Sequence, residues 1–213
     1  MEKQKKISEA VIKRLPRYYR YLGDLKNENI LRISSKDLSN LMGITASQIR
    51  QDLNCFGGFG QQGYGYNVDY LYDEIGKILG TDRENSVIIL GGGNLGKAIA
   101  NYHNFKKRGF SIKAIFDKDK DVIGTEINGI MVYDIKDLKK YLDENHIDIV
   151  VLTLPAKGIK KVIDVIVASD IKGIWNFSYL DLKVPDSIAM VNVHMSDSLM
   201  TLSYKISEKE KEM

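Results

Sequence analysis

The stretch Val87-Ile88-Ile89-Leu90-Gly91-Gly92-Gly93-Asn94-Leu95-Gly96 decides the fold of the larger part of this chain. A short apolar run leads directly into the glycine pattern G-x-G-x-x-G, which starts at Gly91. A second apolar run, residues 112–116, ends at Asp117. Strand, glycine turn, helix, strand and acid in this order are typical of a dinucleotide-binding βαβ unit. We therefore expect an α/β fold with a Rossmann-like parallel sheet over residues 85–194.

The glycines and the acid of this unit have separate roles in the expected cofactor site. Gly91 permits a tight turn, Gly93 lets a pyrophosphate approach the backbone at the start of the helix, and Gly96 lets helix and strand pack closely. The carboxylate of Asp117 accepts hydrogen bonds from the adenine ribose and repels a 2′-phosphate. This favours NAD(H) over NADP(H), although Lys118 weakens the preference. The end of a later strand also lines the crevice. The candidate cofactor residues are Gly91, Gly92, Gly93, Asn94, Leu95, Gly96, Asp117, Lys118, Thr153, Leu154 and Pro155.

The rest of the C-terminal region fits further helices and strands. We expect a helix from Asn94 to about Lys107. Later segments alternate as helix 134–145, strand 147–152, helix 156–169 and strand 173–175. The chain closes with an amphipathic helix over 195–207, whose apolar stripe consists of Met195, Leu199, Leu202 and Ile206. Such a stripe more often packs into the chain's own core than against a partner, so we expect it to be buried.

The residues before the glycine pattern predict a separate domain over residues 1–80. A first helix fits 8–25, with Pro16 as a point of kinking or restart. Its inward face is expected to hold Ile12, Leu15, Tyr19 and Leu22. Ser34 and Asp37 have capping-box spacing and begin a second helix, which ends at Gly43.

A third helix follows this tight glycine turn. Thr45 and Gln48 repeat the capping-box spacing, and the helix extends over 46–54 with Ile49, Leu53 and Phe56 facing inward. Two short helices joined in this way are typical of a helix-turn-helix. The outward side chains suit base edges and phosphates: Ala46, Ser47, Gln48, Arg50, Gln51 and Asn54. An ordinary three-helix bundle with a polar surface has the same pattern.

Alternating glycines and aromatics over residues 57–67 predict a β-hairpin beside the third helix. Tyr64, Tyr66 and Val68 keep a period of two, and Gln61-Gln62 lies near the tip. Such a hairpin would be the wing of a winged helix-turn-helix, whereas a flexible glycine-rich linker is the alternative. The remaining candidate DNA contacts are Phe59, Gln61, Gln62, Gly63 and Tyr64 in this segment, with Arg14, Ser34 and Ser35 before it.

Composition sets limits on both domains. The 213 residues give room for two cores, and residues 1–67 hold 11 Lys and Arg against 6 Asp and Glu, as a polyanion-binding segment requires. A basic surface without a partner would have the same charge. The single Cys55 excludes an internal disulfide and favours the cytoplasm. The sequence contains neither a membrane span nor metal-ligand spacing among its three histidines. Tyr102 and Lys106 have the Y-x-x-x-K spacing of short-chain dehydrogenases, but they occur too early in the fold to act as that pair.

In combination and in order, the motifs resemble one known family. They include 12–16 and 18–22 in the first helix, Arg32-Ile33-Ser34-Ser35, 48–53, Phe56-Gly57, 63–66, 91–96, Phe116-Asp117 and Asn176-Phe177. Nearly the whole chain resembles the Rex family of redox-sensing transcriptional repressors, which are bacterial proteins that sense NADH.

The resemblance implies a homodimer. In it, residues 195–213 form a dimerisation helix and a tail, and the helix swaps onto the partner subunit. On this reading Met195, Leu199 and Leu202 become an interface. NADH, bound in the Rossmann domain in place of NAD⁺, closes the dimer and releases double-stranded operator DNA, so that fermentation and respiration genes are repressed when NADH is scarce. Tyr102 matches a tyrosine near the nicotinamide, and Arg20 matches an arginine in a state-dependent ion pair.

The chain also departs from the family pattern. Gln51 stands where a second basic residue is usual, and Gln61-Gln62 where the wing carries an arginine, so weaker or less salt-dependent DNA binding is expected. His194 stands where an aspartate usually pairs with the arginine, and Met195 replaces a larger apolar residue. Because histidine titrates near neutrality, the switch is expected to be altered or pH-sensitive.

The sequence therefore predicts an NADH-responsive repressor that is not an enzyme and has no metal site and no membrane segment. Two alternatives stay open. One is a small NAD-dependent oxidoreductase with an N-terminal interaction domain, and the other is a CoA-binding module, because glycine-turn domains of similar outline bind CoA.

Overall fold

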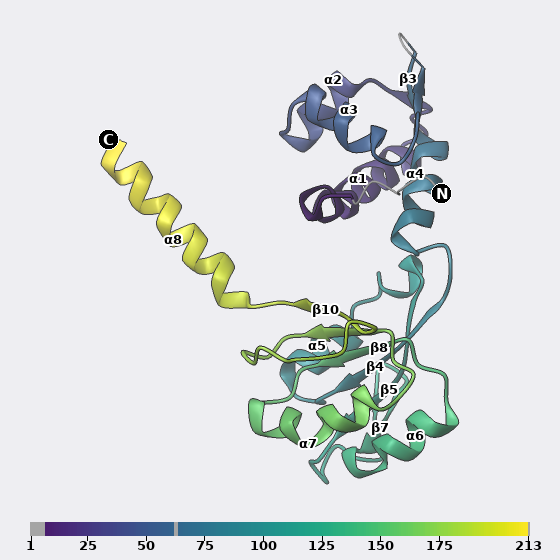
Figure 1. Ribbon diagram of the computed structural model, residues 1–213, viewed down its shortest axis with the longest axis vertical. Helices are drawn as coiled ribbons and strands as arrows, with labels where there is room; N and C mark the ends of the chain where they lie inside the picture. Colours follow the sequence, from purple (N-terminus) through teal and green to yellow (C-terminus); the bar gives the residue numbers. More distant parts are fainter. Residues whose placement is uncertain (1–6, 62–63, 213) are drawn as a thin grey trace. The chain divides into compact units, whose positions relative to one another are not determined.

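The computed structural model describes residues 7–61 and 64–212, without the side chains of 60, 61 and 212. The chain divides into two compact units, Met1–Arg83 and Glu84–Met213 (Figure 1). Among the predicted candidates, Gln62, Gly63 and the side chain of Gln61 lie outside the described part.

The N-terminal unit is a winged helix-turn-helix. Its helices and strands are α1 (Glu9–Asn27), β1 (Arg32–Ile33), α2 (Ser35–Met42), α3 (Ala46–Asn54), β2 (Gly60–Gln61), β3 (Gly65–Asn67) and α4 (Val68–Leu79). Ser34 and Thr45 cap α2 and α3 as predicted, because each hydroxyl accepts a hydrogen bond from the backbone amide three residues later. Gly43 ends α2 with φ of 65°, and this left-handed turn sets the angle between the two helices.

The wing is a three-stranded antiparallel sheet in the order β1-β3-β2. Gly60 pairs with Tyr66 and Gln61 with Gly65, which confirms the predicted hairpin. The side chain of Tyr66 is buried in the core of the unit, whereas Tyr64 is 70% exposed. Asn67 ends the strand and caps α4, because its side chain accepts from the amide of Tyr70.

The inward face of α1 differs from the prediction by one position. The buried residues are Val11, Leu15, Tyr18 and Leu22. Ile12 is 49% exposed, and Tyr19 is half-buried, with its ring stacked on that of Tyr72 at 4.3 Å. The helix continues through Pro16, because this residue removes only one backbone hydrogen bond, to the carbonyl of the exposed Ile12. The predicted restart is therefore wrong, and the alternative of a kink stays a prediction.

The C-terminal unit contains one seven-stranded sheet. Its strands are β4 (Asn85–Leu90), β5 (Phe110–Asp117), β6 (Glu126–Ile127), β7 (Ile130–Asp134), β8 (Ile149–Leu152), β9 (Gly173–Asn176) and β10 (Ala189–Asn192). They lie in the order β10-β9-β8-β4-β5-β7-β6, and only the β6–β7 pair is antiparallel. Without β6 this is the Rossmann order, so the strand order reverses between β4 and β8, where such sheets bind ligands.

Both faces of the sheet are covered. Helices α6 (Leu138–Glu144) and α7 (Ala156–Val167) lie on one face, and α5 (Asn94–Ala100) lies on the other (Figure 1). Ile88 and Leu90 pack on the side of α6 and α7, whereas Val87 and Ile89 pack on the side of α5. A strand buried on both faces needs a continuous apolar run, as the sequence has here.

Two predicted helix bounds in this unit are wrong, and three strands were missed. The helix expected to reach Lys107 ends at Ala100, because the side chain of Asn101 donates to the carbonyl of Lys97 and the chain turns back to pack Phe105 against Trp175. A short 3-10 helix, η1 (Lys106–Arg108), follows. The segment expected to be helical from 134 instead opens with the end of β7 and a 3-10 turn, η2 (Ile135–Asp137). The strands β6, β7 and β10 were not predicted.

The last helix, α8 (Met195–Glu212), is longer than the predicted 195–207. Its apolar stripe is exposed rather than buried: Met195 59%, Leu199 68%, Leu202 53% and Ile206 50%. The expectation that this stripe packs into the chain's own core is therefore wrong. Within one copy of the chain, these side chains remain in contact with solvent.

Candidate nucleotide and DNA sites

The glycine loop after β4 combines two tightly packed glycines with one open glycine. A Cβ on Gly96 would overlap the carbonyl oxygen of Gly91, and a Cβ on Gly91, where φ is 115°, would lie 2.7 Å from Oγ1 of Thr153. By contrast, nothing lies within 4 Å of a Cβ built on Gly93, which is exposed together with Asn94. The protein's own packing explains why residues 91 and 96 are glycines, but it does not explain why residue 93 is one.

The carboxylate of Asp117 lies beside this loop, at the end of β5. Its Oδ2 accepts a hydrogen bond from the amide of Gly92 at 2.5 Å, and its Oδ1 accepts from the amide of Lys118 at 2.7 Å. The side chain is only half-buried, and Lys118 is exposed. The structure thus brings the predicted acid and the predicted loop together at the carboxyl edge of the sheet.

The end of β8 lies beside the glycine loop. The hydroxyl of Thr153 lies within hydrogen-bond distance of the carbonyls of Leu90 and Gly91, at 3.0 and 2.9 Å, so it joins β8 to the loop where the strand order reverses. Leu154 packs into the core, and Pro155 precedes α7 with its ring exposed. Of these three, Thr153 contacts the glycine loop, Pro155 is exposed at the start of α7, and Leu154 packs against the core.

An aromatic row begins near the same edge. Tyr102, which is 48% exposed, packs edge-on against Phe105, which contacts Trp175, and Trp175 contacts Phe177. Because Tyr102 and Lys106 do not share a helix, the Y-x-x-x-K spacing does not place their side chains on one helix face. This supports the earlier inference that the spacing arises by chance.

The recognition helix α3 is attached to α1 by a buried carboxylate that sequence reasoning missed. Asp52 is fully buried and accepts from Nε and Nη2 of Arg14 at 2.6 and 2.8 Å, from the hydroxyl of Tyr18, and from Nε2 of Gln48. Burial alone would raise the pKa of Asp52, but these donors outweigh it and hold the pKa below its ordinary value. Arg14 is thus committed to an internal ion pair.

The exposed side of the helix-turn-helix carries the other candidates. Ser47, Arg50, Gln51 and Asn54 are exposed on α3, and Ala46 is half-buried. Nη1 of Arg50 donates to the hydroxyl of Ser35 at 3.1 Å, which joins α3 to the start of α2. The hydroxyl of Ser34 caps α2 and donates to Asp37.

Near the wing, Phe59 is half-buried against the ring of Tyr70. Sequence reasoning did not select Arg32, whose guanidinium lies 6.0 Å from the centroid of the Tyr64 ring and whose Nη1 is 3.4 Å from its carbonyl oxygen. Arg32 lies in β1 and adds positive charge to the wing sheet.

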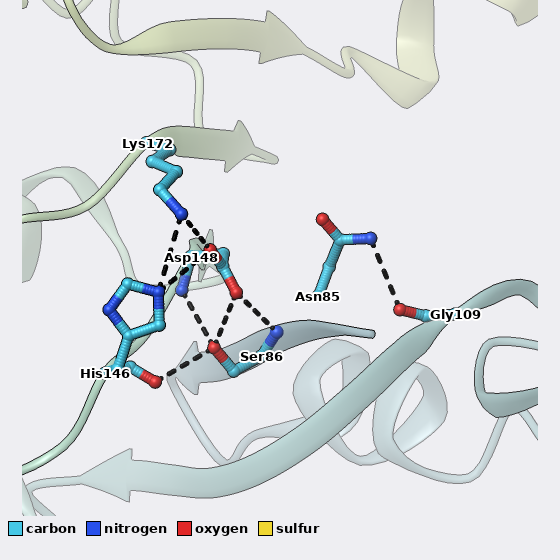
Figure 2. Close-up of polar contacts among 6 residues, drawn as sticks. All are labelled: Asn85, Ser86, Gly109, His146, Asp148 and Lys172. Carbon is cyan, nitrogen blue, oxygen red and sulfur yellow. Dashed lines mark hydrogen bonds and ion pairs between the residues drawn. The ribbon is translucent and has the colours of Figure 1, made fainter. Parts of the chain in front are cut away.

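At the opposite, amino edge of the sheet a polar cluster fastens three strands (Figure 2). Asp148 accepts from the amide and hydroxyl of Ser86 at 2.9 and 2.8 Å and from Lys172 at 2.6 Å, and His146 lies 3.3 Å away. Burial alone would raise the pKa of Asp148, but the bonds from Lys172 and Ser86 hold it well below its ordinary value. Ser86 is buried and bonds to the backbone carbonyl of His146 rather than to its ring. The cluster therefore lacks the serine-to-imidazole contact that a catalytic triad needs.

His194 lies between β10 and α8. Its Nδ1 is 3.6 Å from Oδ2 of Asp197, and its Nε2 is buried with no hydrogen-bond partner among the described residues. Arg20 is exposed, with its guanidinium over the ring of Tyr21. The described residues contain no cluster suited to a metal ion, and no helix among them is both long and apolar enough to cross a bilayer.

Comparison with known proteins matches each unit and then the whole chain. A model described as a putative DNA-binding protein N-terminus matches residues 6–54, and one described as a CoA binding domain matches 82–180. The redox-sensing transcriptional repressor Rex of Clostridioides difficile is 56% identical over 204 residues, which cover 96% of this chain and 97% of its own. The Rex of Clostridium tetani is 52% identical over 210 residues, covering 99% and 100%. The chain belongs to the Rex family.

Solved structures of Rex-family proteins match the same length. The repressor RSP, crystallised with β-NAD⁺ and operator DNA, has a TM-score of 0.91 and 52% identity, covering 97% of this chain and 95% of its own. RSP in complex with β-NADH has a TM-score of 0.88 and 49% identity, covering 97% of each chain. The predicted family and fold class are confirmed. The oxidoreductase alternative is set aside, because the Rex relatives are named repressors and not enzymes.

Proposed function

We propose that this chain is a homodimeric repressor that binds operator DNA through α3 and the wing and releases it when NADH occupies the crevice beside Gly93. It thereby reports the NADH/NAD⁺ ratio. The observation that carries the proposal is the open glycine. Packing requires Gly91 and Gly96 to lack side chains, whereas the space over Gly93 is open and leaves its backbone accessible to a ligand.

The residues around Gly93 fit an adenine dinucleotide. A diphosphate needs close approach to backbone amides, and the open glycine provides it. Asp117, already oriented by the amides of Gly92 and Lys118, presents a carboxylate for the ribose hydroxyls. The same carboxylate would repel the 2′-phosphate of NADPH. When bound, the cofactor supplies no chemistry to a substrate here, because its oxidation state is the signal.

Release of DNA follows from linkage between the two ligands. NADH lowers the affinity for DNA only if it binds one geometry of the dimer better than the other, and the coupling is reciprocal. We assign Tyr102, which is 48% exposed and packs edge-on against Phe105, to sensing of the nicotinamide. Because Cys55 is exposed and unpaired, we also place the protein in a reducing cytoplasm.

The proposed dimer uses the exposed stripe of α8. Met195, Leu199 and Leu202 are each more than half exposed in the single chain, and burial of one such side chain contributes about 1.5–3 kcal/mol. Leu199→Glu is expected to give monomers in analytical ultracentrifugation, with Thr201→Glu on the same helix as the matched control. A Leu199→Glu protein that sediments as a dimer would contradict this interface.

The experiment for the whole proposal is fluorescence anisotropy of labelled operator DNA. Micromolar NADH is expected to release the duplex, and NADPH and CoA at the same concentration are expected to leave it bound. The CoA arm tests the remaining alternative ligand directly. Binding that is unchanged throughout the NADH titration, or release by CoA alone, would refute the proposal.

A further inference from the structure

The buried carboxylate of Asp52 has both oxygens fully used. Oδ2 accepts from Nε of Arg14 at 2.6 Å and from the hydroxyl of Tyr18 at 2.9 Å. Oδ1 accepts from Nη2 of Arg14 at 2.8 Å and from Nε2 of Gln48 at 2.7 Å. An ionised carboxylate has about four acceptor positions. All four are filled, so Asp52 is held rigidly between α1 and α3.

This arrangement fixes which end of the Gln48 amide points toward Asp52. The oxygen and nitrogen of a glutamine amide are usually assigned from their hydrogen bonds. An ionised carboxylate only accepts, and the pKa of Asp52 is held low, so the NH₂ group must face it. The carbonyl Oε1 is then the other end of the amide, and it has no hydrogen-bond partner within residues 7–61 and 64–212.

Gln48 occupies a position from which a base can be read. It is the third residue of α3, after the cap at Thr45, and the N-terminal residues of a recognition helix contact base edges in the major groove. There, a hydrogen bond to a carbonyl oxygen comes from an exocyclic amine, which adenine and cytosine present in the major groove, whereas thymine has none and the amine of guanine lies in the minor groove.

We propose that Gln48 reads an adenine or cytosine on the strand facing α3, and that Asp52 is the positioning residue that sets this choice by holding the amide in one orientation. The inference rests on the proposed DNA-binding function of α3. Arg14 takes part from inside the protein, as the group that keeps Asp52 ionised, rather than as a phosphate contact.

The test is selection of duplexes from a randomised library, followed by sequencing, with the full-length protein. Wild type is expected to prefer A or C over T or G at one position of each half-site by about 5- to 100-fold. Gln48→Ala is expected to lose the preference at that position only. Asn40→Ala is the control, because it removes an exposed amide side chain from α2 that is not among the candidate DNA contacts; it is expected to keep that preference.

Asp52→Asn separates positioning from folding. An asparagine can either donate to or accept from the amide of Gln48, so the preference at this one position is expected to relax while the others persist. A structural role alone would weaken binding to all sequences together. Where Asp52→Asn does not fold, Gln48→Ala alone decides whether this side chain reads the base, because it leaves the ion pair between Arg14 and Asp52 in place.

The outcomes separate the two proposals. If wild type selects no sequence, the DNA-binding function fails. If wild type selects a motif and Gln48→Ala keeps every preference, the inference about Gln48 and Asp52 is overturned. It is also overturned if T or G is preferred at the position that Gln48→Ala relaxes. In both cases the DNA-binding function stands.

Discussion

Gly93→Ala isolates cofactor binding from folding. The backbone at Gly93 has φ of −70° and ψ of −170°, which alanine adopts without strain, and the new methyl group meets nothing within 4 Å. Alanine at a helix N-cap costs up to about 1 kcal/mol relative to glycine, and about 0.4–1 kcal/mol is regained from the unfolded state. The free energy of unfolding is therefore expected to change by less than about 1 kcal/mol.

The same methyl group occupies the space through which the diphosphate must approach. Overpacking of this kind costs about 1–3 kcal/mol, which corresponds to an increase of about 5- to 150-fold in the Kd for NADH. Isothermal titration calorimetry measures the Kd, and urea denaturation measures the stability. Normal NADH affinity in a folded Gly93→Ala protein would show that the diphosphate does not pass over Gly93.

Gly96→Ala is the matched comparison. Its methyl group overlaps the carbonyl oxygen of Gly91, a backbone atom that cannot rotate away, so β4 and α5 must move apart. We expect a loss of at least about 3 kcal/mol in the free energy of unfolding. A Gly96→Ala protein as stable as Gly93→Ala would contradict the difference in packing between the two positions.

Three further predictions concern single side chains. Asp148→Asn is expected to lower the free energy of unfolding by about 1–3 kcal/mol at pH 7. Because the folded pKa of Asp148 is depressed, its stabilisation is complete above about pH 4–5 and is lost as the pH falls further, so urea titrations of wild type and variant should converge in acid. Tyr18→Phe, which leaves Asp52 one donor short, is expected to cost about 1.5–3 kcal/mol in the same assay, and an unchanged midpoint would contradict that bond. Arg50→Ala is expected to reduce the slope of log K against log salt for DNA by about 0.9, whereas Gln51→Ala leaves it unchanged; equal slopes for all three proteins would exclude Arg50 as a phosphate contact.

Local signals in the sequence were sufficient for much of the fold. The caps at Ser34 and Thr45, the turn at Gly43 and the run into Gly91 each depend on neighbouring residues, so they could be predicted without knowledge of the tertiary structure. Asp117 could be paired with the glycine loop because the Rossmann order places their strands side by side.

The features that were missed depend on distant partners. Asp52 follows two polar residues and looks like part of an exposed helix face, and only Arg14, 38 residues earlier, explains its burial. The inward face of α1 was misplaced because Tyr18 and Tyr19 are both apolar enough to pack, and the hydroxyl of Tyr18 decides between them by reaching Asp52. The strands β6 and β10 have two and four residues at the sheet edges, too short for a periodic pattern.

The hydrogen bonds by which Asp148 joins three strands of the sheet have a consequence for biosynthesis. Its partners Ser86 and Lys172 are separated by most of the second unit, so a nascent polypeptide cannot complete this contact until α7 and the residues after it have been translated. The helix-turn-helix, whose hydrophobic core consists of residues from the first unit, can fold while that synthesis continues. A premature stop codon between residues 90 and 170 would therefore release a truncated product that has the winged helix-turn-helix but lacks a complete Rossmann-like unit.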